Sequence, residues 1–302
     1  MLKRLTKAAN RRRSSETVVP DERCVFLYEA DSHGGHRLGL CNPNALLTTE
    51  DGDEVNPQLG SFQKYIWELR TDAIEWAVAL AAGDEIIPGH GGDITHGKKY
   101  PEQLFTDSVA EQVEIAFHNM LPLFGLPNVR AGRLIHGTAS HVLGQGSTEI
   151  LVAKLLQGAF PDKDIKPLAH VLLNIRGKIF DVAHHGPGAG IRQWTRGNVA
   201  RHYLRSQMWQ DFKCGNRPAD VYLRAHYHTF VWETIRERFD GEMREVHLII
   251  MPSWCGMTEY ARQATHSEYE LTNGLVAFEI ANGDLTIHPR VTTLDLRVRE
   301  TI

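Results

Sequence analysis

Apolar residues along this chain fall into short continuous runs and into stretches with helical spacing. The run 24–28, Cys-Val-Phe-Leu-Tyr, is bounded by charged residues, as expected of a strand covered on both faces. Over residues 62–80 the apolar positions recur every three or four residues, which predicts an amphipathic helix that ends at Gly83. Residues 109–120 show the same spacing. The first half of the chain therefore predicts alternating strands and helices.

The second half of the chain continues this pattern. Further strands are predicted at 85–88, 133–136, 179–183, 220–225, 248–251, 274–280 and 284–287. The pair Asn282-Gly283 predicts a hairpin between the last two strands, and a helix is predicted at about 191–212. This alternation predicts a layered α/β architecture with two packed sheets.

Length and charge narrow the classes of protein that fit. With 302 residues and 42% hydrophobic content, the chain can bury a sizeable core, and no long linker divides it. We expect residues 1–18, which are polar and basic, to be a flexible tail, and residues 19–302 to form a single domain. A net charge of -4 argues against a dedicated nucleic-acid binder, so nucleic acid would need a local basic patch.

The cysteines and the absence of long apolar stretches predict a cellular compartment. Cys24, Cys41, Cys214 and Cys255 are far apart, and we expect them to be reduced, buried thiols. No apolar stretch approaches the roughly 20 residues that span a bilayer, and the first residues do not resemble a secretion signal. The expectation is a cytoplasmic protein with no membrane partner.

Acidic and histidine side chains follow five of the predicted strands. In chain order the segments are Asp31-Ser32-His33, Gly92-Asp93, Gly137-Thr138-Ala139-Ser140-His141, His184-His185 and His226-Tyr227-His228. Open α/β sheets place their sites just beyond strand ends, so we expect these segments to converge. Carboxylates and imidazoles bind divalent metal ions. With 16 histidines a single match means little, but the order of the segments predicts one shared metal site.

This order resembles the calcineurin-like metallophosphoesterase superfamily. The blocks of that family are Asp-X-His, Gly-Asp-X-X-(Asp/His), Gly-Asn-His, a histidine block and Gly-His-X-His, and the resemblance spans roughly residues 24–229. It implies an α/β fold, a four-layer double β-sandwich flanked by helices, with a dinuclear metal site at the strand ends. The site would hold two divalent transition-metal ions. Mixed carboxylate and imidazole ligation favours Mn or Zn, with Fe, Ni and Co as alternatives, over Mg or Ca.

The resemblance also implies a ligand set. The first metal would be held by Asp31, His33 and His228, the bridging ligand would be Asp93, and the second metal would be held by His184 and His226. His185 is the alternative to His184, and the choice of His184 follows the family's His-X-(Pro/Gly) pattern. Two other histidines near Asp93, His90 and His96, are expected to be solvated loop residues, with contact to the substrate or to a metal ligand as the alternative.

The third block departs from the family pattern. Gly137-Thr138-Ala139-Ser140-His141 stands in place of Gly-Asn-His, which resembles uncharacterised bacteriophage-type members. Because the asparagine oxygen is missing, Thr138 or Ser140 would substitute for it, or His141 would itself be a metal ligand. We expect His141 to be the catalytic general acid. In the last block, Ala225 replaces the usual glycine.

The implied activity is that of a metallophosphoesterase, a hydrolase that acts on a phosphate ester. We expect a phosphodiesterase in which a hydroxide bridging two divalent metals attacks phosphorus. One alternative is a DNA or RNA nuclease of the same fold, in which Arg192 and Arg196 contact substrate phosphates, although a solvated helix face is the simpler interpretation of that segment. The other alternative to a phosphodiesterase is a non-catalytic binding scaffold. The substrate, a small ester, nucleotide or nucleic acid, and the oligomeric state stay open.

Overall fold

The computed structural model describes residues 22–49, 51–139, 141, 147–188, 197–239, 241–257 and 269–301. These residues form a mixed α/β arrangement with two large sheets and a small ribbon of β2 (Leu47–Thr48) and β3 (Glu54–Val55). The predicted tail, residues 1–18, lies outside the described residues. Within the described residues, no helix is long and apolar enough to cross a membrane.

The first large sheet has six strands in the order β13-β12-β1-β4-β5-β6. Its parallel part consists of β1 (Cys24–Glu29), β4 (Glu85–His90), β5 (Ala131–Ile135) and β6 (Asp164–Leu168). The antiparallel hairpin of β12 (Glu270–Ala281) and β13 (Asp284–Asp295) completes it, so the hairpin predicted at Asn282-Gly283 is confirmed. All six residues of β1 are buried, as its continuous apolar run predicts.

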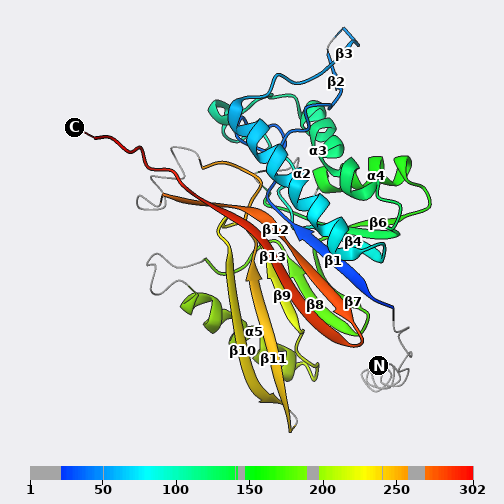
Figure 1. The fold of residues 1–302 in the computed structure, drawn as a ribbon, viewed down its shortest axis with the longest axis vertical. Helices are drawn as coiled ribbons and strands as arrows, with labels where there is room; N and C mark the ends of the chain where they lie inside the picture. Colours follow the sequence, from blue (N-terminus) through cyan, green and yellow to red (C-terminus); the bar gives the residue numbers. More distant parts are fainter. Residues whose placement is uncertain are drawn as a thin grey trace, which may run out of the picture.

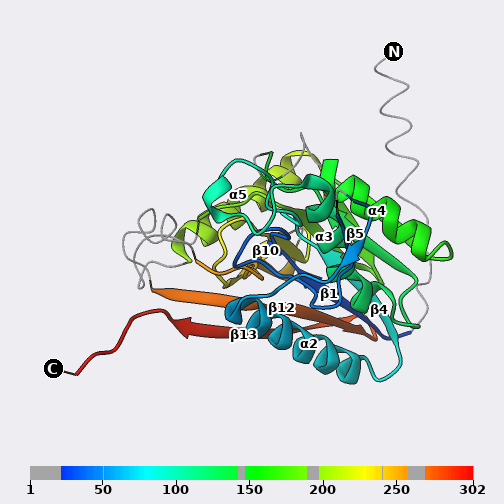
Figure 2. The same cartoon turned by 90° about the horizontal axis from the view of Figure 1, so that it is seen from above.

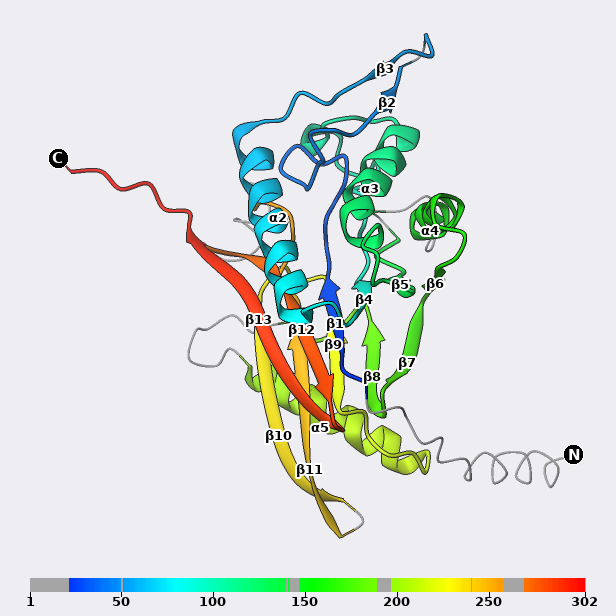
Figure 3. The same cartoon turned by 45° about the vertical axis from the view of Figure 1, so that its right-hand side comes forward.

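The second large sheet has five strands in the order β10-β11-β9-β8-β7. Its central strands β8 (Lys178–Ala183), β9 (Val221–Arg224) and β11 (Glu242–Ile250) are parallel neighbours. The edges are β7 (His170–Ile175) and β10 (Val231–Phe239), which pair antiparallel with β8 and β11. Figure 3 shows the long hairpin of β10 and β11 extending beyond the rest of the sheet.

Four α-helices and one short 3-10 turn (Pro101–Gln103) are present in the described residues: α2 (Ser61–Ala81), α3 (Val109–Phe124), α4 (Ser147–Ala159) and α5 (Asn198–Lys213). The end of α2 agrees with the prediction, because Ala82 and Gly83 both adopt positive φ there. The Ser108 hydroxyl caps α3 by accepting a hydrogen bond from the Glu111 N–H. The helix predicted at 191–212 corresponds to α5, with 191–196 outside the described residues.

Side chains of β1 alternate between two separate cores. Leu27 packs on the helix side with Ile66 of α2 and Met120 of α3, whereas Phe26 packs between the sheets, edge-on to Phe180 of β8 at 5.0 Å between ring centroids. A third core lies between the five-stranded sheet and α5. The cores order the elements as helices, six-stranded sheet, five-stranded sheet and α5 (Figure 1). Figure 2 shows α2 running alongside β12 on one face of the molecule.

Two predictions about single residues need correction. Cys24, Cys41 and Cys255 are buried free thiols as expected, but Cys214 is exposed, because it lies just after the end of α5 and not in a core. His90 is fully buried and His96 is 4% exposed, so neither is a solvated loop histidine. His90 is the last residue of β4, and the loop that carries His96 folds back over the predicted site.

Candidate metal centre

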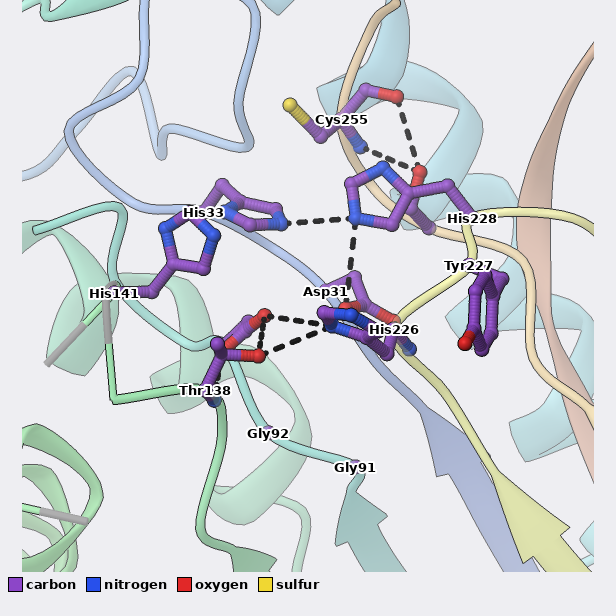
Figure 4. Close-up of polar contacts among 12 residues, drawn as sticks. Asp31, His33, Gly91, Gly92, Thr138, His141, His226, Tyr227, His228 and Cys255 are labelled. Carbon is purple, nitrogen blue, oxygen red and sulfur yellow. Dashed lines mark hydrogen bonds and ion pairs between the residues drawn. The ribbon is translucent and has the colours of Figure 1, made fainter. Parts of the chain in front are cut away.

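The five predicted segments converge at one edge of the paired sheets. Each segment follows the carboxyl end of a strand in the parallel part of its sheet, namely β1, β4, β5, β8 or β9. Since parallel strands end at the same edge, and the two sheets face each other, the loops of both sheets meet there. Figure 4 shows His33, Thr138, His141, His226 and His228 around one space.

Ligand atoms in this space lie close enough together to share metal ions. Four sets of three side chains have their nitrogen and carboxylate oxygen atoms within 4.8 Å of one another. These sets are Asp31-His33-His228, Asp31-Asp93-His184, His184-His185-His226 and His33-His96-His141. All six predicted metal ligands belong to these sets. The sets also include His96, which we expected to be solvated.

The backbone at this site is strained. Asp31, His33, Asp93, His226 and His228 all have positive φ, between 45° and 76°. A non-glycine residue in this left-handed region costs of order 1–3 kcal/mol, and such residues cluster at functional sites. The other described non-glycine residues with positive φ lie at a helix end or in hairpin turns. The strain therefore coincides with the residues that the sequence predicts to bind metal.

One half of the site is built around His33. Its Nε2 faces the Nε2 of His228 at 3.0 Å, and the Nε2 of His228 lies 3.6 Å from Oδ1 of Asp31. Asp31 is fully buried, and its Oδ1 has no hydrogen-bond partner among the described residues, whereas its Oδ2 accepts a hydrogen bond from the His226 N–H. Three lone-pair-bearing atoms thus point at one position, an arrangement that a cation satisfies.

The other half is built around Asp93. Its Oδ1 accepts a hydrogen bond from the Thr138 N–H at 2.5 Å, and its Oδ2 lies 3.1 Å from both the Thr138 hydroxyl and the Nε2 of His184. The Thr138 hydroxyl is also 3.1 Å from the Nδ1 of His226. Thr138, one of the residues that we expect to replace the missing asparagine oxygen, therefore lies among the predicted ligands of the second metal. Its hydroxyl contacts both predicted ligands of the second metal.

The structure distinguishes His184 from His185. His184 is buried, and its Nδ1 donates to the Gly91 carbonyl at 2.7 Å, which fixes the tautomer so that Nε2 faces Asp93. His185 is exposed, with its ring 4.8 Å from that of His226. His184 has the fixed orientation that a metal ligand needs, whereas His185 lies on the outer side of the same set.

Two glycines allow these segments to approach closely. A Cβ at Gly137 would lie 2.2 Å from Oδ1 of Asp93, and a Cβ at Gly92 would lie 2.7 Å from Nδ1 of His184. Gly92 also has φ of +102°. A side chain at either position would push the strand-end loops apart. The glycines next to the predicted ligands thus have a steric explanation.

The two halves differ in charge. Burial, together with the charges of His141 and His228, lowers the pKa of His33 well below its usual value. Burial alone would lower the pKa of His184, but the hydrogen bond with Asp93 and the charges of Asp31 and Asp93 raise it to about 9. Burial would raise the pKa of Asp93, which its hydrogen bonds with His184 and His226 instead lower. The buried imidazole of His33 in the first half thus favours its neutral form, whereas that of His184 in the second half favours the charged form beside the Asp93 carboxylate.

His141 occupies the wall of the site beside His33. Its Nδ1 donates to the carbonyl of His96 at 2.7 Å, and its ring centroid lies 4.8 Å from that of His33. With Nδ1 engaged, Nε2 is the nitrogen left to act. This geometry suits a proton donor, and it also places His141 in a possible ligand set with His33 and His96.

For His96, contact with a metal ligand is only the alternative expectation from the sequence, and the structure shows contact with the predicted ligand His33. Its Nδ1 is 3.3 Å from the Nδ1 of His33, its Nε2 is buried without a hydrogen-bond partner among the described residues, and burial beside His36 and His141 lowers its pKa to about 3. If Nε2 of His33 binds a cation, its Nδ1 carries the proton and donates to Nδ1 of His96. The pattern Gly-Asp-X-X-His, which ends at His96, could have identified this residue.

Several predicted residues lie outside the described part of the chain. These are Ser140, Arg192 and Arg196. In the described part of α5, the Nε of Arg201 lies 2.5 Å from a carboxylate oxygen of Glu233, and Arg205 pairs with Glu237 at 3.1 Å. These two arginines therefore form a salt-bridged face between α5 and β10.

Comparison with known proteins adds little to this geometry. No protein-family model and no curated protein matches the chain. Among solved structures, the chain is similar to a protein of unknown function from Aquifex aeolicus, at 12% identity, over 68% of this chain and 80% of that chain, with a TM-score of 0.27. A likeness this distant carries no argument about fold or activity.

Proposed function

We propose that this protein is a metal-dependent phosphodiesterase of the calcineurin-like metallophosphoesterase type, with two divalent transition-metal ions at the converging strand ends. The observation that carries the proposal is Oδ1 of the buried Asp31, which accepts no hydrogen bond and faces Nε2 of His228 at 3.6 Å within overlapping sets of ligand atoms. A buried carboxylate oxygen without a partner is costly unless a cation or proton donor satisfies it. The order of helices, sheet, sheet and helix is compatible with the double β-sandwich of that family.

The residues present fit such ions. Asp31, His33 and His228 would hold one, and His184 and His226 the other. Asp93, which contacts His184 and His226 and shares a set with Asp31, would be the bridging ligand. Mixed oxygen and imidazole donors favour Mn or Zn. Thr138 fits the place of the absent asparagine, since its hydroxyl reaches Asp93, His184 and His226.

The metal ions would supply Lewis acidity, which neutralises charge on the phosphate and lowers the pKa of water. Backbone and side-chain groups of the protein would orient the metal ligands and donate a proton beside that centre. The Gly91 carbonyl fixes the tautomer of His184, and the Thr138 N–H holds the Asp93 carboxylate in place. The His96 carbonyl holds Nδ1 of His141, so that its Nε2 can give a proton to the departing ester oxygen.

The decisive test combines metal content with hydrolysis. Purified protein should contain close to two transition-metal ions per chain by elemental analysis, and should hydrolyse bis(4-nitrophenyl) phosphate. Asp93→Asn should lose most of both, because this carboxylate is the proposed bridging ligand and shares a ligand set with Asp31 and His184. Full metal loading and unchanged turnover in Asp93→Asn would contradict the assignment.

His141→Ala separates its two possible roles. As a general acid, His141 contributes about 10²- to 10⁴-fold to esters with poor leaving groups, and much less to nitrophenyl esters, whose leaving group needs little protonation. Metal content should be unchanged in this variant. Loss of metal would instead show that His141 is a ligand.

A further inference from the structure

Three exposed cations are adjacent in sequence to buried histidines, His36 and His96, whose rings pack in a row with that of His141. Arg37 directly follows the buried His36, and Lys98 and Lys99 follow the buried His96. The two segments are joined, because the Arg37 N–H donates to the Gln103 carbonyl in the loop that carries both lysines. We call Arg37, Lys98 and Lys99 the cationic rim.

The cationic rim differs from the basic face of α5. Within the described ranges, none of the three rim side chains forms an ion pair, and Lys99 lies over the ring of Tyr100 at 5.3 Å. On α5, by contrast, Arg201 and Arg205 are paired with glutamates of β10. An unpaired cation at the surface is available to an anionic ligand, whereas a paired one must first break its salt bridge.

The position of the rim relative to His141 indicates which side of the scissile bond it would contact. The carbonyl of His96 accepts the hydrogen bond from Nδ1 of the proposed general acid His141, and Gly97 and Lys98 directly follow His96 in the chain. Two residues span at most roughly 7 Å, which places Lys98 close to His141. The group that receives a proton from His141 is the leaving group. Cations beside His141 are therefore placed to contact whatever the leaving group carries.

We propose that the cationic rim binds the backbone phosphates of a single-stranded nucleic acid on the leaving-group side of the scissile bond. This inference rests on the proposed function, and it identifies the substrate as a strand instead of a small diester. Lysine and arginine side chains bind backbone phosphates without regard to sequence. The overall charge of -4 is compatible with this, because the rim is a local patch.

Binding of a fluorescent single-stranded oligodeoxynucleotide to the manganese-loaded protein tests the rim directly. The variant Lys98→Gln/Lys99→Gln should bind more weakly, and the slope of log affinity against log salt should fall in magnitude by about 1.4, since each phosphate contact on a single strand contributes about 0.7. The matched control is Lys154→Gln/Lys213→Gln, which removes two exposed lysines from α4 and α5. It should leave the slope unchanged. Equal slopes in the rim variant and wild type, or an equal loss in the control, overturn the proposal.

Hydrolysis of two substrates tests whether the rim contacts the leaving-group side of the scissile bond. The rim variant should raise KM for an oligonucleotide cut internally, but should not change kcat/KM for a strand whose terminal phosphate carries 4-nitrophenol as leaving group. Equal losses on both substrates overturn the placement at the leaving group. Strand binding is measured without turnover, so the rim proposal can fail while the proposed function holds. Failure of the proposed function would instead appear as absence of bis(4-nitrophenyl) phosphate hydrolysis by wild type.

Discussion

Two buried carboxylates, two residues apart, have opposite surroundings. Glu29, the last residue of β1, accepts two hydrogen bonds from Arg70 at 2.7 and 2.9 Å and one from the Trp254 indole at 2.8 Å. Asp31 lies just beyond it, equally buried, with an unpaired Oδ1 and a left-handed backbone. A complete polar network stabilises the fold, whereas an incomplete one on a strained backbone is arranged for a ligand.

The largest expected effect comes from breaking the incomplete network. Asp31→Asn should lower kcat/KM for bis(4-nitrophenyl) phosphate by about 10³-fold or more, since metal ions contribute several kcal/mol to such reactions and each 1.36 kcal/mol is tenfold in rate. Metal content by elemental analysis should fall with it. Stability in the presence of a chelator should not fall, because the amide oxygen still accepts from the His226 N–H. A large loss of stability in chelator would place Asp31 with Glu29 as a structural residue.

Breaking the complete network should have the opposite outcome. Arg70→Met should reduce the free energy of unfolding by about 3–5 kcal/mol, because it leaves Glu29 buried without its partner. Urea denaturation in chelator measures this. The variant protein that remains folded should keep its metal content, since neither residue is in a ligand set. Loss of metal without loss of stability would break the comparison.

The pH dependence sharpens the same test. Burial would raise the pKa of Glu29, but the charge and hydrogen bonds of Arg70 outweigh it and lower the pKa. In wild type this stabilisation is complete above the unfolded pKa of about 4.3 and is lost as pH falls through the lower folded value. Without Arg70, burial dominates and favours protonated Glu29. The stability deficit of Arg70→Met should therefore begin to shrink above the unfolded pKa of about 4.3, as pH falls through the raised folded pKa of Glu29 in the variant, and should shrink further below it as wild type loses its own stabilisation.

Sequence patterns predicted the strands and the convergence of the ligand segments. They did not predict which residues contact each ligand. The apolar runs before Asp31, Asp93 and His226, together with the rule that open α/β sheets place sites beyond strand ends, were enough to predict that these residues converge. The pairing of Glu29 with Arg70 was not predictable, because it joins a strand end to a position within α2 that helical spacing marks only as polar. The burial of His96 was missed for a similar reason. A polar loop pattern does not show that the loop folds back over a site.

Substitution of His96 should have the smallest of these effects. It extends the comparison of complete and incomplete polar networks from the two carboxylates to a histidine. His96→Leu removes the acceptor for the Nδ1–H of His33, while it touches neither Asp31 nor Asp93 through a hydrogen bond. Partners of this kind fix the orientation of a ligating imidazole, and their loss typically costs about 10- to 100-fold in metal affinity. Competition with a chromogenic chelator measures that affinity.

A conservative variant separates positioning from packing. His96→Gln keeps a side-chain oxygen that can accept the same hydrogen bond, so it should recover most of the metal affinity that His96→Leu loses. If leucine and glutamine weaken metal binding equally, the His33–His96 contact does not orient the ligand, and His96 only fills space. If glutamine rescues affinity, His33 belongs to a network that becomes complete when a cation binds, which is the property that distinguishes Asp31 from Glu29.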